Sequence, residues 1–86
     1  MQRKTVWFQV GDDDVAIDHY TANRPTATRE FNFRIRPKRG DKYDVYRVDV
    51  PIDEVTGLTP HEEAQYLREY VRHRNHTKLF WYRESE

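Results

Sequence analysis

Residues 59–75, TPHEEAQYLREYVRHRN, carry the clearest helix signature in the chain. The other residues must supply the surface on which this helix packs. Thr59 and Glu62 have the spacing of a capping box, and Pro60 suits the first helical position. Acidic residues fill the first turn and basic residues the last, as the helix dipole favours. The stretch therefore predicts one amphipathic helix.

The apolar face of this helix needs an opposing surface. Ala64, Leu67, Tyr70 and Val71 share one side at helical spacing, and four residues cannot form a core alone. We expect this side to pack on the inward residues of a sheet, namely Phe31, Phe33, Ile35, Tyr46 and Val48.

Alternation of apolar and polar residues predicts that sheet. Strands with one buried face are expected at 5–10, 15–20, 31–36 and 43–50, and a last strand at 78–83. Residues 51–58 are expected to turn into the helix. The order is β-β-β-β-α-β. It predicts a two-layer α+β fold, with a mainly antiparallel sheet of four or five strands and one helix on one face.

Length and composition narrow the class of protein. The 86 residues form one domain, 1–86, and 15 basic residues balance 15 acidic ones. A neutral chain lacks the positive field typical of nonspecific nucleic-acid binders. The chain has no cysteine, which excludes disulfides and thiolate chemistry. With no membrane-length apolar run and no signal-peptide apolar region in MQRKTVWFQV, we expect a cytoplasmic protein without membrane contact.

The motifs of catalysis and cofactor binding are missing from the sequence. It contains no nucleophile elbow, phosphate loop or paired-carboxylate motif, so we expect no enzyme and no cofactor. His73 and His76 have a spacing that metal sites use, but His61 lies about 18 Å away along the helix, so we expect no metal site. A small nuclease using residues 72–76 and Lys78 is the weaker enzymatic alternative.

The outward face of the sheet is the first candidate binding surface. By alternation it presents two aromatic residues and three arginines: Trp7, Arg34, Arg36, Tyr43 and Arg47. Tryptophan, tyrosine and arginine are enriched at protein-binding hot spots, and the same types stack on bases and contact phosphates. The structural alternative is a solvated face whose arginines pair with acidic residues on other strands, Glu30, Asp44 and Asp49.

Two further basic features of the sequence are candidate binding sites. The loop 37–42, PKRGDK, places Lys38 and Arg39 in a local basic cluster. Arg68 and Arg72 lie one turn apart on a helix flank, where we expect them to contact a partner rather than form structural pairs.

The leading hypothesis is a small protein-binding module that occludes a partner's surface. Its size is similar to that of viral or mobile-element inhibitors of nucleic-acid-targeting host defence complexes, such as anti-CRISPR proteins. The hypothesis of such a role rests on this analogy alone. The alternative is a nucleic-acid-binding module using the aromatic and arginine face and the loop 37–42. The strand 78–83, if it lies at a sheet edge, can also pair with a second copy to form a homodimer. The predicted partner-binding residues are Trp7, Arg34, Arg36, Lys38, Arg39, Tyr43, Arg47, Arg68 and Arg72.

Overall fold

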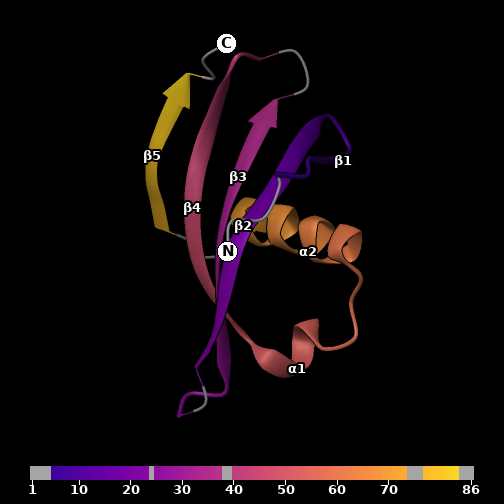
Figure 1. The fold of residues 1–86 in the computed structure, drawn as a ribbon, viewed down its shortest axis with the longest axis vertical. Coiled ribbons are helices and arrows are strands. Elements are labelled where there is room, and N and C mark those ends of the chain that lie inside the picture. Colours follow the sequence, from indigo (N-terminus) through magenta and orange to yellow (C-terminus); the bar gives the residue numbers. More distant parts are fainter. Residues whose placement is uncertain (1–4, 24, 38–39, 74–76, 84–86) are drawn as a thin grey trace.

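The computed structural model describes residues 5–23, 25–37, 40–73 and 77–83. Its strands are β1 (Phe8–Val10), β2 (Asp13–Asn23), β3 (Thr28–Pro37), β4 (Lys42–Pro51) and β5 (Thr77–Arg83), and its helices are α1 (Ile52–Val55) and α2 (Pro60–His73). The strands pair antiparallel in the order β1-β2-β3-β4-β5. Helix α2 crosses one face of this sheet, roughly perpendicular to the strands (Figure 1). The two-layer α+β prediction is confirmed.

The core lies between α2 and the sheet. Phe31, Phe33, Ala64 and Leu67 have no exposed surface, and they form one cluster with Val10, Val15, Val48, Val50 and Val55. The expected helix and strand residues Tyr70, Val71, Ile35 and Tyr46 pack on this cluster while keeping some exposure. Full burial of a large apolar side chain contributes about 1.5–3 kcal/mol, so these contacts hold the two layers together.

The predicted capping box is present at the start of α2. The Thr59 backbone N–H donates to Glu62 Oε1 at 2.9 Å, and the Glu62 N–H donates to Thr59 Oγ1 at 3.2 Å. The helix begins at Pro60 and ends at His73, and the expected continuation to residue 75 lies outside the described residues. Hydrogen bonds from the Thr59 backbone and side chain lower the pKa of the Glu62 carboxyl.

This lowered pKa predicts a pH-dependent contribution to stability. The ionised Glu62 carboxylate stabilises the fold above its ordinary pKa of about 4.3, and the contribution is lost as the pH falls through the lower, folded-state pKa. In urea unfolding, Glu62→Ala is expected to be less stable than wild type at pH 7, and the difference is expected to shrink as the pH falls below the ordinary glutamate pKa. Gln65→Ala, at an exposed position of the same helix, is the control. A pH-independent deficit for Glu62→Ala would contradict the capping role.

Several element boundaries differ from the sequence prediction. Strand β1 begins at Phe8 rather than Thr5. Strand β2 spans Asp13–Asn23 and is longer than the predicted strand at 15–20. The expected turn at 51–58 contains α1, whose Val55 is buried in the core. A helix of four residues is too short to show helical periodicity, so the sequence of this segment did not predict α1.

The β1–β2 hairpin is tied to α2 by Arg68. Its Nε donates to Asp13 Oδ2 at 2.9 Å, and its side chain is 11% exposed. Gly11, in the hairpin turn, has φ +60°, and a Cβ there would lie 3.0 Å from the Arg68 guanidinium. The expectation that Arg68 makes no structural pair was therefore wrong, because the hairpin brings an aspartate from 55 residues away against the helix.

Gly11→Ala is expected to destabilise the domain by about 1 kcal/mol. Left-handed backbone is unfavourable for an L side chain, and the added methyl group crowds the Arg68–Asp13 pair. Thermal or urea unfolding measures the loss. Gly57→Ala, which has φ +85° but open space around a Cβ, separates backbone strain from crowding. If Gly57→Ala lowers the free energy of unfolding as much as Gly11→Ala does, crowding against Arg68 adds nothing to the destabilisation.

Candidate functional site

The outward face of the sheet gathers aromatic rings around arginines. Arg34 lies against two rings, with its Cζ 5.0 Å from the Trp7 ring centroid and 5.3 Å from that of Tyr43. The two rings are 6.2 Å apart and tilted by 58°. Arg36 lies over the Trp7 ring as well, at 4.1 Å. We call Trp7, Arg34, Arg36 and Tyr43 the outer cluster. Its distances are those of cation–π contacts.

Two carboxylates of β2 neutralise the arginines of the outer cluster. Arg34 donates to both oxygens of Asp18, with the shortest contact 2.6 Å, and Arg36 donates to Asp14 at 3.4 Å. Burial lowers the pKa of Arg34, but the hydrogen bonds and charges of Asp18 and Tyr43 together outweigh it and raise the pKa overall. Cross-strand pairing was expected as the structural alternative. For these two arginines it occurs with Asp14 and Asp18 rather than with Glu30, Asp44 or Asp49.

The strand register explains how the outer cluster is assembled. Asp14 lies opposite Arg36 and Ala16 opposite Arg34, so these side chains share the face away from α2. Ala16 is 1% exposed although it belongs to no helix-side core cluster. A small residue at this position leaves room for the larger side chains above it. The sequence offered one signal, an alanine at an outward position between two aspartates.

A β-bulge supplies the second carboxylate. Pairing between β2 and β3 shifts between Ile17 and His19, so Asp18 is the extra residue of β2. Asp18 keeps the outward phase of Asp14 and Ala16, and the bulge shifts the pairing of the residues that follow it. Here the extra residue is the one that holds the Arg34 guanidinium. The sequence alternation does not mark this bulge, because both of its flanks read as regular strand.

The remaining predicted contact residues are placed less closely together. Arg47 is exposed, faces the same side as the outer cluster through its pairing with Asn32, and lies about 13 Å along β4 from Tyr43. Arg72 is exposed on α2, which covers the opposite face of the sheet. Lys38 and Arg39 lie outside the described residues. The structure therefore joins four of the nine predicted residues into one cluster and adds Arg47 to its face.

Strand β5 lies at an edge of the sheet, as the homodimer hypothesis requires. Its Leu79 and Trp81 are 39% and 54% exposed. Pairing with β4 shifts at Leu79, because Val45 lies opposite Phe80 and Tyr46 opposite Lys78. Bulges at sheet edges turn the free edge away from new partners. Pairing with a second copy stays a prediction.

The described ranges show neither a metal-binding cluster nor a membrane-spanning helix. Those residues contain no group of three or more histidine, aspartate or glutamate side chains placed to hold a metal ion. Within the same ranges, neither helix has the length and apolar character needed to cross a membrane.

Fold and site together define a small α+β domain with a charge-neutralised aromatic and arginine cluster on its open sheet face. Comparisons with protein-family models, curated proteins and solved structures found no significant match to the chain.

Proposed function

We propose that this chain is a non-enzymatic protein-binding domain that acts by occluding part of its partner's surface. The observation that carries the proposal is the Arg34 guanidinium packed against the rings of Trp7 and Tyr43 on a partly exposed sheet face. Tryptophan, tyrosine and arginine dominate binding hot spots. Side chains already fixed by their neighbours lose little conformational freedom on binding, so the outer cluster is a ready-made anchor.

Charge separates this proposal from nucleic-acid binding. Phosphate contacts rely on cations, yet Asp18 and Asp14 already accept hydrogen bonds from Arg34 and Arg36. Base stacking needs an aromatic face, and two guanidinium groups already lie against the Trp7 ring. A neutral, partly apolar surface favours a protein partner over a phosphate backbone.

The same proposal has two narrower parts. The domain would act in the cytoplasm, since a chain without cysteine does not depend on an oxidising compartment. Its partner would belong to a nucleic-acid-targeting defence complex, a hypothesis that rests on analogy of size. The identity of a partner bound through the outer cluster tests this second part.

The oligonucleotide test discriminates between the two classes of partner. We expect no micromolar binding of labelled single-stranded DNA or RNA at physiological salt, measured by fluorescence anisotropy. Binding that weakens with salt, with a slope of about 0.7 per neutralised phosphate, and that loses part of this slope in Arg34→Ala would reverse the proposal.

The capture test addresses the protein partner directly. Immobilised wild-type domain and Gln65→Ala are expected to retain the same protein from a lysate of the source organism, and Tyr43→Ala is expected to lose it. Gln65 is exposed on α2, away from the outer cluster, so its variant controls for handling and folding. A captured protein that Tyr43→Ala retains equally would place the interface elsewhere.

A further inference from the structure

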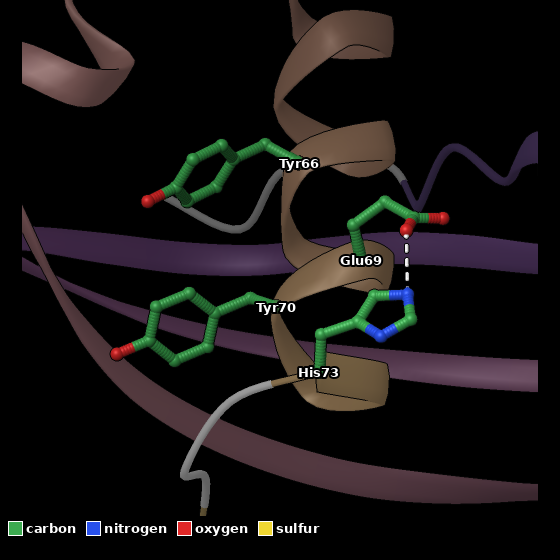
Figure 2. A pocket seen from close by; sticks show the side chains of 4 residues that line it. All are labelled: Tyr66, Glu69, Tyr70 and His73. Atoms are coloured by element: carbon green, nitrogen blue, oxygen red, sulfur yellow. Dashed lines mark ion pairs between the residues drawn. The ribbon is translucent and has the colours of Figure 1, made fainter.

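A separate hollow lies on the helix side of the molecule. It has a volume of about 260 Å³ and is lined by Tyr66, Glu69, Tyr70 and His73. These positions form one stripe along α2 at helical spacing. In Figure 2 both tyrosine rings extend to one side of the helix, and the Glu69–His73 ion pair lies to the other. The volume is below that of pockets for drug-sized ligands, so the hollow suits a small chemical group.

The two rings of the hollow are fixed in place. Their centroids are 6.1 Å apart with 35° between the planes. The Tyr66 hydroxyl donates to a carboxylate oxygen of Glu54 in α1, and the Tyr70 hydroxyl donates to the Asp49 carbonyl oxygen of β4 at 3.3 Å. The hydroxyls are thus anchored on different elements, and the rings form a preorganised aromatic wall.

Charge around the hollow favours a cation. The Glu54 carboxylate accepts from the Tyr66 hydroxyl, and Glu69 lines the hollow from the other side of the helix. Glu69 also contacts His73 Nε2 at 3.1 Å and Arg68 Nη1 at 3.6 Å, but Arg68 makes its closer contact with Asp13, at 2.9 Å. Aromatic faces attract cations, most strongly those that are weakly hydrated, and neighbouring carboxylates add to the attraction.

We propose that this hollow binds an alkylated ammonium group. Two tyrosine faces and a carboxylate are the components with which proteins recognise quaternary ammonium and methylated lysine. A metal ion fits less well, since the hollow offers one histidine and one glutamate, and the described residues contain no group of three ligands. The site is independent of the outer cluster, because α2 lies on the opposite face of the sheet from Arg34.

The test compares a cation with its neutral counterpart. Tetramethylammonium and tert-butanol have similar shape, and only the first is charged. In amide NMR titrations at constant ionic strength, tetramethylammonium is expected to give saturable shifts centred on Tyr66, Glu69, Tyr70 and His73. The response to tert-butanol at the same concentrations is expected to be several-fold weaker. Equal responses, or shifts centred elsewhere, would overturn the proposal.

Variants separate the ring and carboxylate contributions. Tyr66→Leu keeps an apolar side chain but removes one ring, and we expect tetramethylammonium to bind roughly two- to fivefold more weakly. Glu69→Gln is expected to weaken it as well, without depending on the packing of a ring. Thr21→Ala, at an exposed position of β2, is the control and should leave the affinity unchanged. Unchanged affinity in Glu69→Gln and in a folded Tyr66→Leu would contradict the site.

A last experiment distinguishes a methylated lysine side chain from a free small cation as the source of the ammonium group. A short peptide containing trimethyllysine is compared with free tetramethylammonium under the same conditions. Tighter binding of the peptide indicates a methylated protein side chain, and equal binding indicates a free small cation. Absence of binding by both probes would reject the site.

Discussion

Leu67→Ala is expected to lower the free energy of unfolding by about 2–5 kcal/mol, the usual range for a buried leucine truncation. Leu67 has no exposed surface and belongs to the cluster that joins α2 to Phe31 and Phe33. The change removes buried methyl groups and leaves a cavity at the centre of the two layers. In a domain of this size, that loss is a large fraction of the total stability.

Urea unfolding followed by circular dichroism measures this loss. Gln65→Ala changes an exposed residue two positions earlier on the same helix and is expected to stay close to wild type. The comparison isolates burial from helix propensity, since both variants introduce the same residue. A Leu67→Ala midpoint equal to that of wild type would show that α2 does not anchor the sheet.

Trp7→Ala is expected to weaken partner binding by more than 1 kcal/mol, the level that marks energetically important interface residues. The change removes the ring against which both Arg34 and Arg36 lie. Trp7 is partly exposed and outside the helix-side core, so the cost in stability should be smaller than that of Leu67→Ala. Isothermal titration with the captured partner, together with thermal unfolding, measures both effects.

Arg47→Ala provides a graded comparison for this prediction. Arg47 is exposed on the same face, and its variant leaves the outer cluster intact. A rim arginine is expected to change the affinity less than the central ring does. If Trp7→Ala binds the partner as wild type does, the outer cluster is a structural feature and the interface lies elsewhere on the domain.

The layers of the fold were predictable because their signals are local. The capping box fixed the start of α2, and the alternation of Phe31 and Phe33 with polar residues marked the buried face of β3. These patterns depend only on neighbours within one element. The short helix α1 was missed because a single turn has no periodicity to detect.

The pairing of the arginines could not be read in the same way. Arg68 meets Asp13 across 55 residues of sequence, and Arg34 meets Asp18 across 16. Such partners depend on the relative placement of elements, which alternation does not encode. The outward direction of Arg34, Tyr43 and Asp18 follows from alternation, whereas the contact between Arg34 and Asp18 depends on the pairing register of β2 with β3.

That bulge also makes the chain tolerant of one particular change of length. Ile17 lies opposite Phe33 and His19 opposite Asn32, so loss of residue 18 would join two segments already in step with β3. Loss of residue 19 would restore the same register with Asp18 kept opposite Asn32, whereas a deletion in the middle of either regular segment of β2 would turn part of the strand over. A chain lacking Asp18 is therefore expected to keep its fold while releasing the Arg34 guanidinium from its carboxylate. In evolutionary terms, loss of one codon removes the carboxylate that neutralises Arg34 and leaves the Arg36–Asp14 pair in place.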